Sequence, residues 1–585
     1  MTLDLFGTSD LHGSVLQFDY VDMAATQGPA LVQLAKTLKE ARAKTANSML
    51  FDNGDLIQGT AFADTLVANR QAGLNMHSFL GLCGYDAATL GNHDLDYGPD
   101  VLDDLIDTAS CPYVCANIVE GDFKHPPQFI ILPRTVTCHD GQNHELKIGV
   151  TGCLPQQSQY WSQLQMGRNF ELSDPVSATR RAVANMKRAG ADICIVLAHS
   201  GYIADPAPEE PANFARSISQ LADVNAVFAG HIHRAFSQDQ TADGDAATVM
   251  PGCNASHLGH ISLTLVKTDD AWSVTSGTAE AIGSISFHTG DTDIFNTAQN
   301  THRLTLARMN ARLGQTRFAM SSFFAQVAPN SASQFVHNAQ QAHLSSLLEG
   351  TEFQGLPLIS AVALARVGGE EGSKNYSFLP AGPINLHNIH DIYRYENQFC
   401  AMILTGAQIY GWLEQSASCF HQITPHETDQ PLLNPRVPAY DYDTFDGIDY
   451  EIDLTQPAAF DHLGNAVIAP EDRKRIKSIT YKGQPISADQ RFALATSGFR
   501  RNRAPNAPCI EAGMSNRDVL IQYLTQRQVV DPTPIQNWKF SPIKRASAVF
   551  KSSPLAVTAS KLPTAVSYVG PSQKGFALYR IRFDA

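Results

Sequence analysis

Residues 6–14 read FGTSDLHGS and place an acid and an imidazole two positions apart, directly after a strand-like apolar run. Leu3 and Leu5 precede them in the alternation that is typical of a half-buried strand. Asp10 and His12 are therefore expected at the carboxyl end of the first strand. An Asp-x-His triplet is common by chance, so the pair gains meaning only if similar residues recur at later strand ends of the chain.

The same arrangement returns at four later points. These blocks are DNGDLIQG (52–59) with Asp55, TLGNHDLDYG (89–98) with Asn92, His93 and Asp96, VLAHSGY (196–202) with His199, and FAGHIHR (228–234) with His231 and His233. Read singly, Asp55 could be a turn residue and His199 a core histidine. Because each block follows a short apolar run, and ligands of α/β sheets gather at the carboxyl ends of strands, we expect one shared crevice.

This set of side chains has a definite chemistry. Carboxylate, amide and imidazole ligands without thiolate suit Mn, Fe, Co or Zn. Seven such ligands exceed the need of one ion and suit two ions roughly 3.5–4 Å apart that share a bridging carboxylate. Two cations neutralise an anionic phosphate ester and lower the pKa of a water molecule. The sequence therefore predicts a two-metal phosphoester hydrolase.

Length and charge restrict the alternatives. At 585 residues the chain exceeds one hydrophobic core, so two or more domains are expected. A formal net charge of −14 argues against gripping a long nucleic-acid backbone, although a metal can still attract a small anion. No apolar run approaches the ~20 residues of a membrane helix, and no signal peptide is recognisable. We expect a cytoplasmic protein with no membrane contact, or a periplasmic one if a leader was removed.

The coarse organisation is α/β in both halves. Residues 174–190 carry helical spacing after an Asp-Pro start, and residues 291–315 are expected to form a solvated helix that connects two domains. The second half begins near Met320. The charged run at residues 471–477 (EDRKRIK) is expected on a solvated face, and the ten cysteines mostly as buried thiols, with Cys111 and Cys115 as the exceptions.

At this point the chain resembles a known family. SDLHG, GDLIQG, GNHD, AHSG and GHIH resemble the five signature blocks of the calcineurin-like metallophosphoesterases. The longer LFDNGDLIQGTAFAD (50–64) and TLGNHDLDYG resemble the 5′-nucleotidase branch. In the second half, INLHNIHDIYRYENQF (384–399), LTGAQIYGWLEQSA (404–417), DTFDGIDYEIDLTQP (443–457) and GFALYRI (575–581) are most similar to the bacterial bifunctional 2′,3′-cyclic-nucleotide 2′-phosphodiesterases/3′-nucleotidases.

The resemblance implies an α/β fold in two domains. Residues 1–285 would form the dimetal phosphoesterase domain, with two sheets sandwiched between helices. Residues 286–318 would form the connector with its linker helix, and residues 319–585 the nucleotide-binding domain of the 5′-nucleotidase C-terminal type. A monomer is expected, with a small nucleotide as its partner and no polymeric nucleic acid.

The resemblance also implies roles for the predicted site residues. One divalent metal ion would be held by Asp10, His12, His233 and the bridging Asp55, and a second by Asp55, Asn92, His199 and His231. His93 is no ligand in the family and stabilises charge on the reacting phosphoryl group, with Asp96 orienting its ring. Asp96 matches the broader 5′-nucleotidases, whereas the cyclic-nucleotide branch often has Asn there.

The second half carries the implied nucleoside grip and two departures from the family pattern. Two aromatic rings sandwich the base in this family, and Tyr395 matches the first position. Phe499 is our candidate for the second, although Asn502 stands where another family aromatic would be. The family's Gly-Gly-Arg reads Gly-Gly-Glu here, with Glu370, so Arg366, Lys374 or Arg500 would have to compensate, unless the loop points outward.

The predicted activity is hydrolysis of 2′,3′-cyclic nucleotides to 3′-nucleotides and of these to nucleosides and phosphate. The alternatives are a 5′-nucleotidase or nucleotide-sugar diphosphatase on the same scaffold, and a non-catalytic nucleotide-binding protein. The last alternative would usually have lost metal ligands, and none is lost here.

Overall fold

The computed structural model describes residues 1–70, 75–203, 211–268, 271–284, 290–395 and 397–584. The chain forms two compact units, Met1–Ala307 and Arg308–Ala585, called unit 1 and unit 2 below. Among the described residues, no helix is long and apolar enough to cross a membrane. The ten cysteines all lie in this part of the chain and form no disulfide, and Cys111 and Cys115 are buried like most of the others.

Unit 1 is built on two β-sheets. The first has the strand order β15-β14-β1-β4-β5, with β1, β4 and β5 parallel. The second has the order β12-β13-β11-β10-β8-β7, with β8, β10, β11 and β13 parallel. Their bounds are β1 (Thr2–Thr8), β4 (Ser48–Asp52), β5 (Ala87–Ala88), β7 (Phe129–Thr137), β8 (Asn143–Cys153), β10 (Ile193–Ala198), β11 (Ala226–Phe228), β12 (Ala235–Gln238), β13 (Ala247–Pro251), β14 (His257–Thr268) and β15 (Ala271–Gly283).

The inner faces of these sheets pack against each other. Leu5 and Phe51 from the first sheet and Ile195 and Phe228 from the second are buried in one apolar cluster. The rings of Phe51 and Phe228 lie 5.8 Å apart. Gly7 permits this approach, because a Cβ there would lie 2.4 Å from the Phe228 ring. The buried apolar area between the sheets fixes their strand ends side by side.

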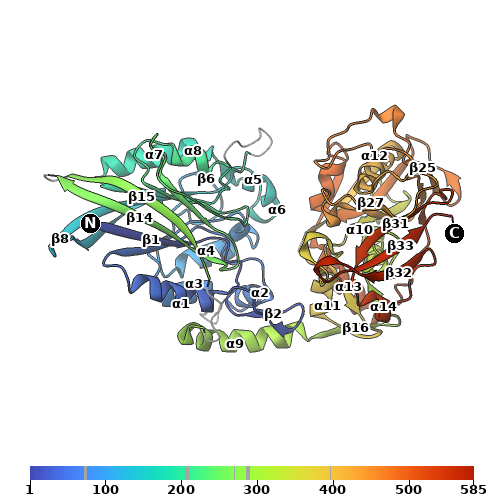
Figure 1. The fold of residues 1–585 in the computed structure, drawn as a ribbon, viewed down its shortest axis with the longest axis horizontal. Coiled ribbons are helices and arrows are strands. Elements are labelled where there is room, and N and C mark those ends of the chain that lie inside the picture. The colour runs from blue at the N-terminus through green and yellow to red at the C-terminus, as the bar shows by residue number, and fades with distance from the viewer. Residues whose placement is uncertain (71–74, 204–210, 269–270, 285–289, 396, 585) are drawn as a thin grey trace. The chain divides into compact units, whose positions relative to one another are not determined.

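Helices cover the outer faces of unit 1 (Figure 1). α7 (Pro175–Arg188) and α8 (Ala215–Ser219) pack on the second sheet, and α1 (Leu31–Arg42) contacts β14 of the first. α7 confirms the helix predicted for residues 174–190, and Asp174 caps it by accepting the backbone N–H of Ser177. The remaining long or short helices here are α2 (Ala61–Ala68), α3 (Met76–Cys83), α4 (Pro99–Asp107), α5 (Ser158–Trp161) and α6 (Gln163–Met166).

The predicted connector helix is shorter and better packed than expected. α9 spans Thr292–Met309, and residues 312–315, predicted to continue the helix, belong to the strand β16 (Arg312–Thr316). β16 pairs with β20 (Gly382–Asn385) and β29 (Val529–Val530). Its backbone groups are therefore hydrogen-bonded to strands distant in the sequence, which a local sequence pattern does not indicate. One face of α9 is buried through Ile294 and Ala298, rather than solvated all round.

Unit 2 has a central sheet with the order β23-β18-β27-β21-β28. Along β21 (Gln398–Thr405), Ala401 and Ile403 face one cluster with α10 (Ser331–Leu347) and α13 (Asn516–Arg527), while Met402 and Leu404 face another with α12 (Gly406–Ser416). The other strands and helices are β17 (Met320–Ser321), β18 (Leu358–Val362), β19 (Phe378–Leu379), α11 (Leu386–Ile392), β23 (Thr444–Asp446), β24 (Asp449–Ile452), β25 (Ile476–Tyr481), β27 (Arg491–Ser497), β28 (Cys509–Ser515), β30 (Trp538–Phe540), β31 (Ser547–Ser552), α14 (Ala556–Ala559), β32 (Val566–Pro571) and β33 (Ala577–Arg582).

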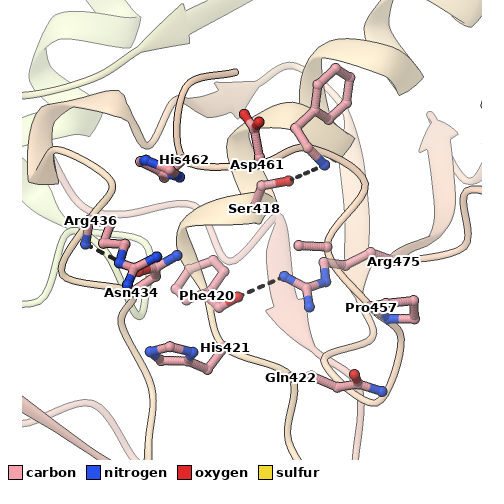
Figure 2. Close-up of a pocket in the computed structure, with 12 residues that line it drawn as sticks. Ser418, Phe420, His421, Gln422, Asn434, Arg436, Pro457, Asp461, His462 and Arg475 are labelled. Carbon is pink, nitrogen blue, oxygen red and sulfur yellow. Dashed lines mark hydrogen bonds between the residues drawn. The ribbon is translucent and has the colours of Figure 1, made fainter. Parts of the chain in front are cut away.

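The charged run at residues 471–477 is not wholly solvated. Arg475 is fully buried, and its guanidinium donates to the carbonyl oxygens of Ala417, Phe420 and Gln456. These carbonyl oxygens accept the N–H donors of the guanidinium, so the buried cation is satisfied without a carboxylate. Arg475 lies beside a cavity of about 350 Å³ in unit 2 (Figure 2), whose lining includes neither Tyr395 nor Phe499.

Candidate metal centre

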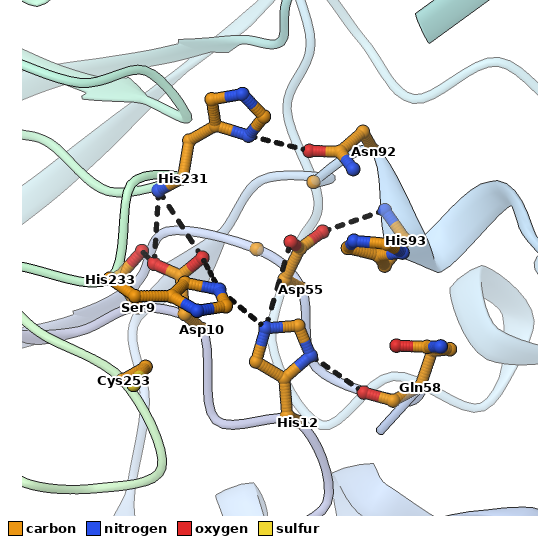
Figure 3. A network of polar contacts seen from close by, with 12 residues as sticks. Ser9, Asp10, His12, Asp55, Gln58, Asn92, His93, His231, His233 and Cys253 are labelled. Carbon is orange, nitrogen blue, oxygen red and sulfur yellow. Dashed lines mark hydrogen bonds and ion pairs between the residues drawn. The ribbon is translucent and has the colours of Figure 1, made fainter. Parts of the chain in front are cut away.

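All five predicted blocks begin directly after a strand of unit 1, as the sequence predicted. β1 ends at Thr8 and leads to Asp10 and His12, β4 ends at Asp52 and leads to Asp55, and β5 ends at Ala88 and leads to Asn92 and His93. In the second sheet, β10 ends at Ala198 before His199, and β11 ends at Phe228 before His231 and His233. Figure 3 shows the side chains gathered around Asp55, which are those of Asp10, His12, Asn92, His93, His231 and His233.

Asp10, His12, Asp55 and His233 form the tighter part of this cluster. Each offers one ligand atom, and these atoms all lie within 4.8 Å of one another. The Nε2 atoms of His12 and His233 are 3.0 Å apart, and His233 Nε2 lies 3.5 Å from Asp10 Oδ1. Ligand atoms that each lie about 2.1 Å from one cation are separated by about 3.0–3.4 Å. The spacing therefore fits a single divalent ion.

The remaining predicted ligands lie on the other side of Asp55. His199 Nε2 is 3.2 Å from Asp55 Oδ2, and His231 Nδ1 is 2.8 Å from Asn92 Oδ1. The rings of His199 and His231 meet edge to face with centroids 5.5 Å apart. Asp55 Oδ2 also lies 3.9 Å from His12 Nε2, so one carboxylate oxygen faces both groups of histidines. This is the position that a bridging ligand requires.

Backbone carbonyls fix two of the imidazole rings. The Nδ1–H of His199 donates to the carbonyl of Asn53 at 2.7 Å, and the Nδ1–H of His12 donates to the carbonyl of Gln58 at 2.7 Å. In this tautomer each ring presents the lone pair of Nε2 to the centre of the cluster. Such outer hydrogen bonds orient metal-binding histidines and raise their basicity.

The donor set fits divalent ions. Asp55 Oδ2 and His199 Nε2 are buried and lie 3.2 Å from each other, and neither has a hydrogen-bond partner elsewhere among the described residues. Burial alone would raise the pKa of Asp55, but the nearby histidines, His199 above all, hold it well below its usual range. The facing carboxylates in turn outweigh burial and raise the pKa of His199 to about 10. The buried carboxylates thus stabilise positive charge at this place, which a bound cation would supply.

The loops that carry these residues adopt a costly backbone conformation. Asp10, His12, Asp55, His231 and His233 all have positive φ, between 48° and 72°. Such angles cost non-glycine residues on the order of 1–3 kcal/mol each and concentrate at functional sites. Loop-to-loop bonds hold them in place, since the N–H of His12 donates to the carbonyl of Asp55 and the N–H of His231 donates to the Asp10 carboxylate.

Two glycines of the predicted blocks are needed for close packing. A Cβ on Gly91 would lie 2.1 Å from Asp55 Oδ1, and one on Gly230 would lie 2.0 Å from Ser9 Oγ and 2.7 Å from Asp10 Oδ2. These contacts explain why glycine directly precedes Asn92 and His231. The carboxylates occupy the space that a side chain would take.

The sequence reasoning missed Asp94, although it lies in the GNHD block. This carboxylate is fully buried and accepts the backbone N–H groups of Gly91, Asp55, Leu56 and Ile57. Burial raises its pKa to about 6, and the charge of Asp55 adds to the effect. Asp94 thus ties the loop after β4 to the loop after β5. Its signal in the sequence was only an acid one residue beyond His93.

His93 lies at the edge of the cluster and is partly exposed. Its backbone N–H donates to Asp55 Oδ1 at 2.7 Å, and its Nδ1 lies 2.8 Å from Asp96 Oδ2. Burial lowers the pKa of His93, but Asp55 and Asp96 outweigh it and raise this pKa to about 9. Both carboxylates favour the protonated ring, whose Nδ1–H is held by Asp96. It can offer Nε2–H to an anionic ligand of the cluster.

Several known proteins are similar to this chain in sequence and in fold. Residues 5–235 match the family model of the calcineurin-like phosphoesterases, and residues 301–511 match that of the 5′-nucleotidase C-terminal domain. A 2′,3′-cyclic-nucleotide 2′-phosphodiesterase/3′-nucleotidase of Salmonella typhimurium is 30% identical over 99% of this chain and 96% of its own length. This chain belongs to the calcineurin-like phosphoesterases, in the branch that carries a 5′-nucleotidase C-terminal domain.

Two further proteins are similar to this phosphoesterase, one in sequence and one in structure. It is 31% identical to a trifunctional nucleotide phosphoesterase of Bacillus subtilis, of which it spans 42% of the length. A solved 5′-nucleotidase structure from Staphylococcus aureus has a TM-score of 0.70 at 20% identity, covering 92% of this chain and all of the other. That likeness shows the two-domain fold. The phosphoesterase model matches within unit 1, and the model of the C-terminal domain matches mainly within unit 2.

The two predicted base-binding residues of the phosphoesterase lie in unit 2 and are exposed. Tyr395 and Phe499 are each 59% exposed, so neither is a core aromatic. Burial raises the pKa of Tyr395, and the negative charge of Glu371 adds to this rise. Burial raises the pKa of Tyr440, which is 43% exposed, and the charge of Asp441 adds to the rise.

The charged residues of unit 2 show which cation could compensate for Glu370. Glu370 is exposed, as expected if its loop points outward. Arg366 Nη1 donates to Asp391 Oδ1 at 2.6 Å, and Arg500 pairs with Asp441 and Asp443. These two arginines are committed to internal carboxylates. Of the three cations that could compensate for Glu370, Lys374 is the exposed one.

Proposed function

We propose that this chain hydrolyses 2′,3′-cyclic nucleotides to 3′-nucleotides and then releases phosphate from the 3′-nucleotides. The observation that carries this proposal is the position of Asp55, whose carboxylate faces His12 and His199 and accepts the N–H of His93. The name of the Salmonella relative, which is similar over the full chain, supports the choice of substrate.

Two divalent ions belong to this proposal. Asp10, His12, His233 and Asp55 would hold one ion, and Asp55, Asn92, His199 and His231 the other. When bound, such ions neutralise the phosphate and activate a water molecule. The mixed oxygen and imidazole donors suit Mn, Zn, Co or Fe. Elemental analysis of the purified protein, with its mass in solution, would identify the native metals and test the expected monomer.

His93 would assist the leaving oxygen. In the first reaction water adds to phosphorus, the bond from phosphorus to O2′ breaks, and O2′ takes a proton. In the second the bond to O3′ breaks in the same way. His93, when protonated and held by Asp96, can donate Nε2–H to the phosphoryl group or the departing oxygen. A fixed donor aimed at developing negative charge lowers the barrier of both reactions.

Unit 2 would bind the nucleoside through Tyr395 and Phe499. Stacking of a base on an aromatic ring contributes about 1–3 kcal/mol and tolerates any base. The pairing of Arg366 with Asp391 and of Arg500 with Asp441 suits a neutral nucleoside better than a phosphate dianion. This difference favours a neutral nucleoside over a phosphate group at this part of unit 2.

A substrate panel tests the proposal. Phosphate release by the Mn-loaded protein is compared for 2′,3′-cyclic AMP, 3′-AMP, 5′-AMP and UDP-glucose, with a phosphatase added for the diester products. We expect the cyclic and 3′ substrates to have the highest kcat/KM, and His93→Ala to abolish turnover. Preference for 5′-AMP or UDP-glucose would instead assign a 5′-nucleotidase or nucleotide-sugar diphosphatase. Two bound ions without turnover of any ester would indicate a binding protein.

A further inference from the structure

One tryptophan of unit 1 is exposed beside the candidate metal centre. Trp161 is 52% exposed, whereas Trp272, Trp412 and Trp538, the other three tryptophans of the chain, are at most 9% exposed. Its ring is stacked on that of His231, with centroids 5.7 Å apart and an angle of 13° between the planes. A large apolar ring that stays in water next to a ligand cluster calls for a reason.

The helix that carries Trp161 is anchored by other residues. Ser158 is fully buried at the start of α5, and the Trp161 N–H donates to the carbonyl of Gln157 at 3.1 Å. The side chain of Gln159 accepts the N–H of Leu172 in the neighbouring strand β9 (Glu171–Leu172) at 2.9 Å. The indole therefore is not needed to fix α5. The indole lies over His231, with half of its surface left to solvent.

We propose that Trp161 is a substrate-positioning residue that packs against the ribose of the nucleotide. This inference rests on the proposed function. In a 2′,3′-cyclic nucleotide the ribose is fused to the phosphate ring, so a phosphate at the cluster brings the sugar next to the residues that surround the ligands. The indole of Trp161 stacks on His231, which would be a ligand of the proposed second ion. The C–H face of a sugar packs on an indole through dispersion and loss of hydrated apolar surface.

Trp161 belongs to unit 1, and its proposed contact is with the sugar rather than with the base. A ribose contact is independent of the base, so its removal should affect purine and pyrimidine nucleotides equally.

Kinetics of Trp161→Ala and Trp161→Phe test the inference, with Tyr160→Ala as the control. Tyr160 is 69% exposed and lies next to Trp161, but no ring of the described residues stacks on it. For Trp161→Ala we expect KM for 3′-AMP and 3′-CMP to rise about five- to tenfold alike, the range of one aromatic contact. The inhibition constant of inorganic phosphate and the metal content should stay unchanged, and Trp161→Phe should recover most of the loss.

A merely structural role for Trp161 gives a different result. If the indole only held His231 in place, Trp161→Ala would lower the metal content and weaken inhibition by phosphate together with turnover. That outcome, or an unchanged KM for both nucleotides, overturns the inference and leaves the proposed function intact. An effect on 3′-AMP without one on 3′-CMP would also overturn it, because it would indicate a base contact. Failure of the wild-type protein to hydrolyse any nucleotide overturns both proposals.

Fluorescence supplies a readout apart from turnover. Because Trp161 is the exposed tryptophan among four, acrylamide quenching of the chain's fluorescence reports mainly on its ring. We expect adenosine in the presence of inorganic phosphate to protect the ring from acrylamide, and phosphate alone to leave it accessible. Equal quenching under both conditions would contradict contact between the nucleoside and Trp161.

Discussion

Asp94 Oδ2 accepts the backbone N–H of Asp55 at 2.9 Å, and this bond helps a buried acid outside the proposed ligand set to fix the loop of the proposed bridging ligand. Asp55 has a φ of 56°, and its carboxylate accepts the backbone N–H of His93. The Asp94 carboxylate receives three further N–H groups from the two loops. One side chain thus keeps a strained loop in the form in which its acid faces the histidines.

The first prediction concerns Asp94→Asn. An amide has one acceptor oxygen and a donor NH₂, so it cannot accept four N–H groups, and the loop after β4 loses bonds that hold Asp55. We expect metal affinity and kcat/KM to fall about 10- to 100-fold, as is usual for outer residues of metal sites. Metal titration of the variant gives the measurement. Asp243→Asn, an exposed acid in a turn, is the control, and equal behaviour of the two variants would refute this role.

The second prediction concerns the pH dependence of activity. The protonated form of His93 acts in our account, and Asp55 and Asp96 raise its pKa to about 9, against the effect of burial. Asp96→Asn removes one of these charges and so lowers the pKa of His93. The alkaline limb of the kcat profile should therefore move to lower pH in the variant. A variant whose alkaline limb stays in place, with activity lost evenly at all pH values, would show that Asp96 does not act through the proton of His93.

The third prediction concerns the nucleoside grip. Tyr395→Ala removes one of the two proposed stacking rings, and KM for 3′-AMP should rise about 5- to 100-fold. Turnover of a phosphate ester without a base, such as glycerol 2-phosphate, should not change, since Tyr395 lies in unit 2 and the predicted ligands in unit 1. Tyr568→Ala, which removes another exposed tyrosine of unit 2 in β32, is the control. Similar losses for both substrates would exclude base stacking.

The fourth prediction concerns stability at mildly acidic pH. His77 in α3 is 1% exposed, its Nε2 lies 2.8 Å from the Tyr113 hydroxyl, and burial lowers its pKa to about 4. In the unfolded chain its pKa is near 6.5, so the unfolded state binds more protons as pH falls from about 6.5 to about 4. His77 should therefore cost about 2 kcal/mol of stability at pH 5 relative to pH 7.5.

Urea unfolding of the wild type and His77→Gln at the two pH values measures this effect. Glutamine keeps a hydrogen bond to Tyr113 but does not titrate, so the advantage of the wild type over the variant should shrink at pH 5. His125→Gln, at an exposed histidine, should leave the pH dependence as it is. An unchanged difference for His77→Gln at both pH values would show that this histidine is not kept neutral by burial.

The strand ends were predictable from the sequence because the apolar run of each strand and the polar block after it are neighbours in the chain. Runs such as residues 193–198 are apolar throughout, and the polar block begins at the next residue. The start of α7 at an Asp-Pro pair was predictable for the same reason. The family resemblance added the roles of the ligands, which the residue pattern alone could not assign.

The remaining features depend on contacts between distant segments. Residues 312–315 look helical locally but pair as part of β16 with strands far along the chain. Arg475 reads as a surface charge, yet carbonyls from two other segments satisfy it in the core. The spacing of residues along the sequence does not predict the positive φ of His12 or the stacking of Trp161 on His231. Such features follow from tertiary packing, which overrides local preference.

Metal titration of the demetallated protein is the most direct test of the two-ion centre. Mn²⁺ is added in steps, and bound ions per chain are measured together with phosphate release from 3′-AMP. Our account predicts that activity rises until two ions are bound per chain and that Asp55→Asn binds fewer and stays inactive. Full activity with one ion bound, or activity that survives complete removal of metal, would contradict it.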